Sequence, residues 1–267
     1  MNVRAALAFN KMSFQEIVFF RAFFLLTILA NIIFTIIVYF LWRAIFDGVG
    51  TDTINGMTFQ QTFLYLASAK ILNSVVISYC EWQMSRDVQT GNIATSFCKP
   101  ISYQFRMYSS CFGSILSNFA IMFIPSIIIV AIVAKGAIPI GINLLFFPIA
   151  FILAALLNIT FDFLIGLLSF FTESVWGIST MKDTVVRLLS GAVIPIAFFP
   201  DNIRKVLEFL PFQAIYNLPI QILTNPNYSL WDICRALLIQ LIWVIVLFLI
   251  SKICFIRASK HVMVNGG

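Results

Sequence analysis

Apolar residues run along this chain in long unbroken stretches, and short polar segments separate them. About 20 apolar residues in a row are enough for a helix to cross the hydrocarbon layer of a membrane. Apolar and polar residues do not alternate here as they would in the strands of a transmembrane barrel. The pattern therefore predicts an all-α, polytopic membrane protein with six transmembrane helices. We place these helices at about residues 19–42, 59–79, 108–134, 143–171, 184–200 and 231–256.

Three further segments have a mixed pattern, and we interpret each as lying at a membrane surface. Residues 1–18 form an irregular amphipathic stretch, typical of a helix along the cytoplasmic surface. Residues 80–107 combine charges with a Gly break and a Pro break, which predicts a short surface helix, a turn and a re-entry. Residues 201–222 predict an outer amphipathic helix with Asp201 as its N-cap, followed by irregular chain that dips back into the membrane.

The fifth predicted span is marginal, because Gly and Pro both weaken the hydrogen bonding inside a helix. A polar loop, residues 172–183, precedes this span. We expect a broken helix that acts, with the re-entrant segment after it, as a lid or gate; the alternative is a simple kinked span. The candidate gate residues are Gly191, Pro195, Pro200 and Pro211.

Hydrophobic residues make up 61% of the chain and charged residues 10%. This composition excludes a soluble domain, so we treat residues 1–267 as a single transmembrane domain. The net charge of +6 fits cytoplasmic loops and anionic headgroups, so we expect membrane lipid and no nucleic acid as partners. With the amino terminus inside, eleven Lys and Arg lie on the inner side and five on the outer side. This bias predicts that both termini are cytoplasmic.

Residues that carry common catalytic chemistry are scarce. The one histidine, His261, lies in the tail, and the five cysteines include no CxxC pair, which argues against a catalytic triad, a metal site or a disulfide framework. No GxxxxGK[ST] phosphate loop is present, so any ATP must be bound by partner subunits. We therefore expect a transport subunit that is not an enzyme and has no cofactor of its own.

Small and polar residues recur at a spacing of four in four of the spans, which places them on one face of each helix. They either let helices approach closely or line a polar path. Lys70 and Asp162 favour a path, because an ionisable side chain inside a membrane usually faces water or a partner; the two could also pair with each other. The candidate path residues are Asn31, Lys70, Ser74, Asn118, Asn158 and Asp162.

Two stretches carry a family resemblance: RDVQTGNIATSFCKPIS, residues 86–102, and SGAVIPIAFFPDNIRKVLEFLPFQAIYNLP, residues 190–219. Together with the order of the spans, they make the chain resemble the membrane subunit of an ABC-2 type exporter, with a type V exporter-like transmembrane domain. The chain departs from the family pattern at Cys98 and Lys99, which precede the Pro, and we find no large external domain in it.

The resemblance implies a permease that forms a translocation path as a dimer, with a second copy or a paralogue, in the plasma (inner) membrane of a prokaryote. Separate cytoplasmic ATP-binding cassette subunits would drive it. Substrates of the family include drugs, peptides and lipids, and the 29 Phe residues suggest an amphipathic cargo. The alternatives are a membrane-embedded enzyme or scaffold, and an ion-coupled secondary transporter that uses Lys70 and Asp162.

The segment from Glu81 to Pro100 is the expected docking site for the ATPase subunit. Its charges would fix the register against a complementary surface, and its apolar residues would anchor the interface. A glycine would let the chain turn tightly between helix and return segment. The expected coupling residues are Glu81, Arg86, Asp87, Val88, Gly91, Ile93 and Pro100.

Overall fold

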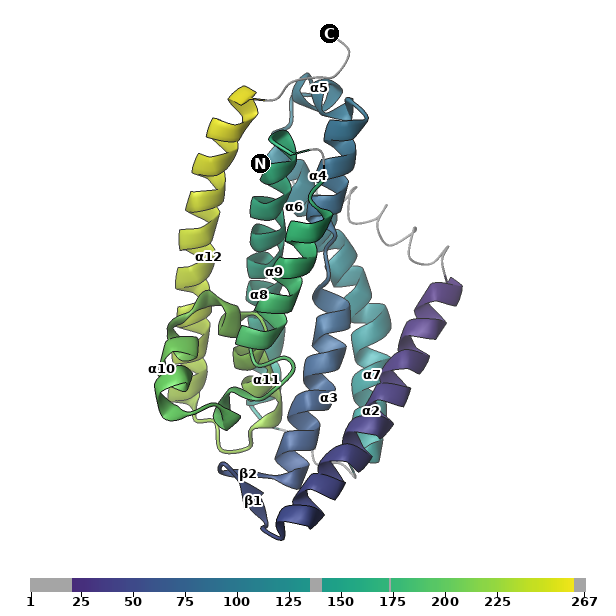
Figure 1. Cartoon of the computed structure of the whole chain (residues 1–267), viewed down its shortest axis with the longest axis vertical. Coiled ribbons are helices and arrows are strands. Elements are labelled where there is room, and N and C mark those ends of the chain that lie inside the picture. The colour runs from purple at the N-terminus through teal and green to yellow at the C-terminus, as the bar shows by residue number, and fades with distance from the viewer. Residues whose placement is uncertain (1–20, 135–140, 173, 262–267) are drawn as a thin grey trace.

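The computed structural model describes residues 21–134, 141–172 and 174–261 (Figure 1). The predicted interfacial helix, residues 1–18, lies outside these ranges. Within them the chain is almost entirely helical, which confirms the all-α, polytopic prediction. The described residues hold five helical segments long and apolar enough to cross a membrane, where six were predicted. These segments are Leu25–Val49, Phe59–Gln89, Tyr103–Val133, Asn143–Phe170 and Leu230–Ala258.

The long helices form an elongated bundle (Figure 1). The first half of the described chain contains α2 (Arg21–Val49), α3 (Phe59–Val76), α4 (Cys80–Gln89), α5 (Asn92–Phe97), α6 (Tyr103–Asn118) and α7 (Ile124–Val133). The second half contains α8 (Asn143–Gly166), α9 (Trp176–Leu189), α10 (Asp201–Phe209), α11 (Asn217–Thr224) and α12 (Leu230–Ala258). Helix α5 lies at one end of the bundle, which we call the α5 end, and a small hairpin lies at the other.

The hairpin consists of β1 (Thr53–Ile54) and β2 (Met57–Thr58), joined by the turn Asn55–Gly56. Both turn residues have positive φ, at 49° and 79°, as a tight hairpin turn requires. Thr58 then accepts a hydrogen bond from the backbone N–H of Gln61, whose side chain accepts the N–H of Thr58 in return. This capping box fixes where α3 begins.

Helix α8 lies at the centre of the bundle, where α4, α6, α11 and α12 contact it. The small residues Ala150 and Ala154 are fully buried and let neighbouring helices approach closely. Gly166 lies further along the same stripe, and a Cβ atom there would lie 2.6 Å from Met84 Sδ and 3.1 Å from Glu81 Cα. The spacing of four therefore produces close packing of α4 on α8.

A short break, Ile77–Tyr79, separates α3 from α4. Tyr79 has a φ of 52°, a left-handed conformation that costs a non-glycine residue about 1–3 kcal/mol. The sequence predicted that a surface helix follows this point. Helix α4 begins there and packs one face against α8, where Cys80 and Met84 are fully buried, whereas Trp82 and Arg86 on its other face are exposed.

The predicted fifth span at residues 184–200 is not a continuous helix. Helix α9 begins inside the predicted polar loop, at Trp176, and ends at Leu189. Its 14 residues extend about 21 Å, which is less than the hydrocarbon thickness of about 30 Å. Gly191 follows with a φ of 82°, a left-handed conformation incompatible with a continuing helix. The helix therefore ends before Gly191, which agrees with the expected broken helix and not with a simple kinked span.

The re-entrant segment is more regular than predicted. After α10 the chain forms a 3₁₀ turn, Pro211–Ala214, and then helix α11, so its backbone groups are bonded within helices. Residues of α11 are mostly buried, and the helix contacts α3 and α8. Two side-chain hydrogen bonds attach this segment to α3: Tyr65 Oη donates to Asn217 Oδ1 at 3.0 Å, and Asn73 Nδ2 donates to Tyr216 Oη at 2.9 Å.

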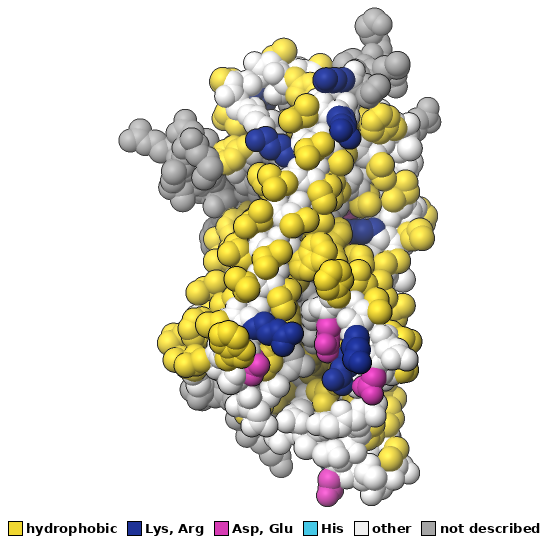
Figure 2. All heavy atoms as spheres, turned by 90° about the vertical axis from the view of Figure 1, so that its left-hand side faces the viewer, with side chains coloured by type: hydrophobic (Ala, Val, Ile, Leu, Met, Phe, Trp, Pro, Cys, Tyr) yellow, Lys and Arg dark blue, Asp and Glu magenta, His cyan; other side chains and the backbone are white. Residues whose placement is uncertain are grey.

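Exposed apolar side chains cover the outward faces of α2 and α12. Figure 2 shows apolar side chains over most of one face of the molecule, with Lys and Arg gathered toward the top and in the lower part. A broad apolar face of this kind suits contact with the hydrocarbon layer of a membrane. The prediction of a multi-pass membrane protein agrees with this surface.

Candidate functional site

A buried polar cluster forms where the break between α3 and α4 meets α8. The end of a helix leaves backbone carbonyls without partners in the helix, and here Asn158 Nδ2 donates to the carbonyl of Val76 at 3.1 Å. Ser78, inside the break, donates its hydroxyl hydrogen to Asp162 Oδ2. Because Asn158 and Asp162 are four residues apart on α8, both side chains face the break.

Asp162 is the centre of the cluster. It accepts hydrogen bonds from Ser78 Oγ, from Asn158 Nδ2 at 3.0 Å, and from Lys182 Nζ on α9. Its side chain is only 3% exposed. A buried carboxylate is tolerated when charged and neutral donors surround it in this way.

Lys182 joins three helices. Its ammonium group contacts Asp162 of α8, Asp183 of α9 at 2.6 Å, and Glu81 of α4 at 3.6 Å. Burial by itself lowers the pKa of Lys182, but the carboxylates of Asp162 and Glu81 raise it, and the net result lies above the ordinary value. Lys182 is therefore a fixed positive charge at neutral pH. Glu81 also accepts a hydrogen bond from Ser179 Oγ at 2.7 Å.

The spacing of the acidic groups also suits a metal ion. Glu81, Asp162 and Asp183 each offer one carboxylate oxygen within 4.8 Å of the others. However, the ammonium group of Lys182 lies against all three carboxylates. The protein itself thus supplies a cation to this arrangement.

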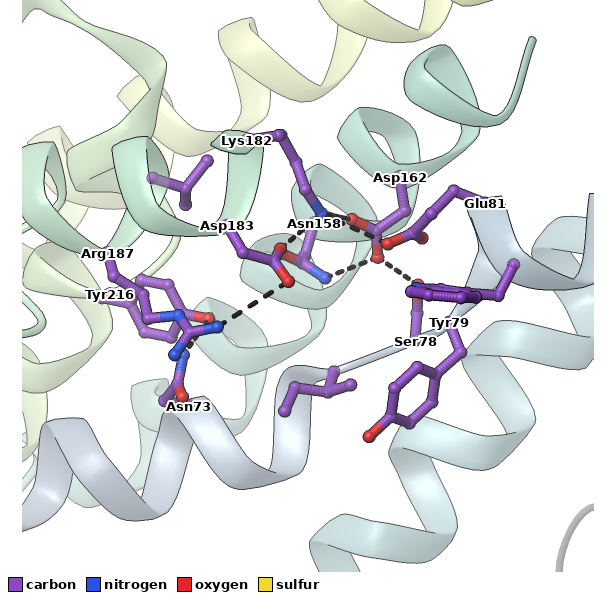
Figure 3. Close-up of a pocket in the computed structure, with 13 residues that line it drawn as sticks. Asn73, Ser78, Tyr79, Glu81, Asn158, Asp162, Lys182, Asp183, Arg187 and Tyr216 are labelled. Carbon is purple, nitrogen blue, oxygen red and sulfur yellow. Dashed lines mark hydrogen bonds and ion pairs between the residues drawn. The ribbon is translucent and has the colours of Figure 1, made fainter. Parts of the chain in front are cut away.

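A cavity of about 40 Å³ adjoins the cluster (Figure 3). Two aromatic side chains, Tyr79 and Trp82, also line it and are 60% and 41% exposed. The cavity therefore has a charged interior and aromatic groups that remain accessible. Its lining residues are Asn73, Ile77, Ser78, Tyr79, Glu81, Trp82, Asn158, Asp162, Lys182, Asp183, Val186, Arg187 and Tyr216.

Of the six predicted path residues, the structure brings only Asn158 and Asp162 into this cluster. The other four lie elsewhere: Asn31 Nδ2 donates to Ser74 Oγ at 3.3 Å between α2 and α3, and Asn118 is half-buried at the end of α6. Lys70 Nζ lies 5.3 Å from the centre of the Phe34 ring of α2. Asn31, Lys70 and Ser74 therefore support contacts between α2 and α3 more directly than a shared path.

Within the chain, Lys70 does not pair with Asp162. Asp162 takes Lys182 as its cation, whereas Lys70 lies on the part of α3 that faces α2. Sequence reasoning missed Lys182 and Asp183 because both fell in a predicted loop. Their only signal is weak: Ser179, Lys182 and Val186 recur at helical spacing, and this is the side of α9 that turns inward.

The α4–α5 segment, residues 80–97, contains six of the seven predicted coupling residues, all except Pro100, and several of the six have partners inside the protein. Glu81 belongs to the cluster, and Ile93 is fully buried. Asp87 accepts hydrogen bonds from Arg106 Nη2 at 2.7 Å and Tyr103 Oη at 3.1 Å. Each of these three residues, Glu81, Asp87 and Ile93, already has partners within the chain. They are therefore not all free to contact an ATPase subunit.

The other predicted coupling residues are more accessible. Arg86 and Pro100 are exposed and Val88 is half-buried. Gly91 has a φ of 71° and makes the turn between α4 and α5, which is the conformation that favours glycine. Exposed side chains at the α5 end also include Gln89, Thr90, Asn92, Thr95, Phe97 and Lys99.

The predicted gate residues lie in the segment between α9 and α11. A Cβ atom on Gly191 would lie 2.6 Å from Tyr65 Oη, so the chain passes α3 at close range. Pro195 begins a 3₁₀ turn and is buried, Pro200 precedes α10, and Pro211 begins the 3₁₀ turn before α11. Each proline stands at the start of a short helical piece, where its missing N–H needs no partner.

The fold and the cluster define a multi-pass helical membrane protein with ionisable groups buried between its helices. The sequence was compared with models of known protein families. The family model described as ABC-2 family transporter protein matches residues 32–266. The chain belongs to this family, and membership implies association with an ATP-binding subunit in general. A search of curated protein sequences finds no match.

Proposed function

We propose that this chain is the permease subunit of an ATP-binding cassette exporter. Two such subunits, identical or paralogous, would form the translocation path, and separate ATPase subunits would drive it. The α5 end would face the cytoplasm of a prokaryotic cell, with both termini on that side of the plasma membrane. Family membership over residues 32–266 supports transport over a membrane-embedded enzyme or scaffold.

The observation that carries the mechanism is the position of Lys182. Its ammonium group contacts carboxylates of α4 and α8 while belonging to α9. A movement of α4 would therefore displace α9. Through the break at Gly191, the movement would also reach the α10–α11 segment. This arrangement suits a device that converts motion at the α5 end into motion of the opposite half of the bundle.

The docking surface is best assigned to the exposed side chains of the α4–α5 segment. Arg86 is exposed, whereas the neighbouring Asp87 is held by Arg106 and Tyr103. The internal bonds make the segment rigid, and the exposed side chains would contact the ATPase. Rigid attachment matters, because a flexible segment would absorb the motion instead of passing it on.

The ion-coupled alternative loses its main support. It required Lys70 and Asp162 to act together, but Asp162 binds Lys182 and Lys70 contacts Phe34. A carrier of that kind would need another pair of ionisable groups to bind and release its ion.

The test uses a charge reversal at the proposed docking surface. We expect Arg86→Glu to weaken co-purification with the ATP-binding cassette subunits and to reduce the ATP hydrolysis that depends on the permease. Lys205→Glu is the matched control, because Lys205 is equally an exposed basic residue but lies on α10. If both variants associate and stimulate hydrolysis like the unmodified chain, the docking surface lies elsewhere.

A further inference from the structure

The buried cluster carries an excess of negative charge. Two carboxylates, those of Glu81 and Asp162, have side chains 4% and 3% exposed, and the one ammonium group between them, that of Lys182, is 10% exposed. Asp183 and Arg187 add a half-exposed pair at 3.7 Å, which leaves the balance unchanged. A buried negative charge without a partner is costly, so the cluster favours one further positive charge, which a proton or the cationic group of a ligand can supply.

The hydrogen bonds show where that charge would be received. Asp162 already accepts from three donors. Glu81 differs, because Oε1 accepts from Ser179 but the buried Oε2 atom has no hydrogen-bond partner among the described residues. Glu81 lines the cavity, and Figure 3 shows its carboxylate directed toward Asp162 and Lys182.

The size of the cavity and its aromatic residues restrict the ligand. Its volume of about 40 Å³ is room for about three water-sized groups, which suits a small charged head and excludes a ring system. The exposed rings of Tyr79 and Trp82 are part of the same lining. Aromatic faces attract ammonium groups by cation–π interaction and also offer apolar contact for a hydrocarbon tail.

We propose that this cavity recognises the positively charged head of an amphipathic substrate that carries one cationic group. The head would approach the carboxylate of Glu81 past Tyr79 and Trp82, and the apolar tail would lie against the two rings and the adjoining hydrocarbon layer. This inference rests on the proposed function, because it names the substrate class of the same permease. It narrows an amphipathic cargo to a cationic one.

A matched pair of probes tests the inference. Dodecylammonium carries a primary ammonium group, which is small and has N–H donors, on an apolar chain, and dodecanol is its neutral counterpart with the same chain. Binding of each probe to the purified full chain in nanodiscs is measured by isothermal titration calorimetry, with empty nanodiscs as the reference. We expect saturable binding of the cationic probe, and only partition into lipid for the neutral one.

Three variants make the result specific. Glu81→Gln removes the receiving charge and Trp82→Ala removes a ring, and each should weaken cationic binding about tenfold, the effect of roughly 1.4 kcal/mol. Trp176→Ala is the control, because Trp176 is an exposed tryptophan that does not line the cavity, and its affinity should not change. If Glu81→Gln does not fold, Trp82→Ala still decides the question.

The inference is overturned if the cationic probe shows no saturable binding, or if both probes bind alike. It is also overturned if Trp82→Ala binds the cationic probe no more weakly than Trp176→Ala. None of these outcomes contradicts the proposed function. The proposed function is contradicted by a different result, namely that no ATP-binding cassette subunit associates with the chain. The binding measurement uses the chain alone, so it can still be interpreted in that case.

Discussion

Lys182→Met is the perturbation with the largest expected effect on stability. Methionine keeps a long unbranched side chain but removes the ammonium group that contacts Glu81, Asp162 and Asp183. Two of those carboxylates would remain buried without their cation. Removing one partner of a buried ion pair costs about 3–5 kcal/mol, because the remaining charge is uncompensated.

The expected loss is measurable by thermal unfolding of the purified chain. For a chain of roughly this size, 1 kcal/mol moves the midpoint by about 2–4 °C. The midpoint of Lys182→Met should therefore fall by roughly 6–20 °C. Lys205→Met is the control, because Lys205 is exposed on α10, and its midpoint should stay close to that of the unmodified chain.

A second substitution separates lost charge balance from lost packing. Asp162→Asn added to Lys182→Met removes one of the uncompensated carboxylates, so the double variant should recover part of the loss, about 0.5–3 kcal/mol of coupling. The reasoning is refuted if Lys182→Met is no less stable than Lys205→Met. It is refuted equally if the double variant is less stable than Lys182→Met alone.

Three glycines, with a fourth as a control, give further predictions. Gly166→Ala should lower the midpoint of thermal unfolding, because its Cβ would meet a sulfur atom of α4 at 2.6 Å, whereas Gly177→Ala, with open space around it, should not. Gly191→Ala should destabilise in the same assay, because its φ is 82° and its Cβ would lie 2.6 Å from Tyr65 Oη. Gly91→Pro should reduce ATP hydrolysis that depends on the permease while the chain still folds, because proline cannot adopt a φ of 71°.

The length of the hydrophobic runs was enough to predict the long helices, because every helix that crosses the hydrocarbon layer needs about 20 apolar residues. The spacing of four on α8 also identified Asn158 and Asp162, since residues four apart share a helix face. Sequence could not identify Lys182 as the partner of Asp162. The pairing of Lys182 with Asp162 depends on how α9 packs against α4 and α8. The local sequence pattern does not show this packing.

The coupling segment illustrates the opposite error. A run of charged residues such as Glu81, Arg86 and Asp87 looks exposed when only its neighbours in sequence are considered. Two of the three have partners well separated in the chain: Glu81 contacts Ser179 and Asp87 contacts Arg106. Burial of charge therefore became visible only with the tertiary structure.

The expected break near Gly191 is present, but the bounds predicted for the fifth span were wrong for a related reason. Residues 172–183 are polar enough to resemble a loop, but most of them form α9, whose polar side chains find carboxylates on α4 and α8. Gly191 then ends the helical region where the sequence placed the middle of a span. Polar and ionisable residues inside a membrane protein usually face the interior of the bundle, where neighbouring helices supply their partners.

The most direct measurement is ATP hydrolysis by the purified chain alone and by the chain reconstituted with the ATP-binding cassette subunits encoded in the same genome. We expect no hydrolysis above background from the chain alone, since its sequence has no phosphate-binding loop. The reconstituted complex should hydrolyse ATP at a rate that depends on the chain. Hydrolysis by the chain alone, or ATPase subunits that neither bind the chain nor respond to it, would contradict the assignment as an ATP-driven permease subunit.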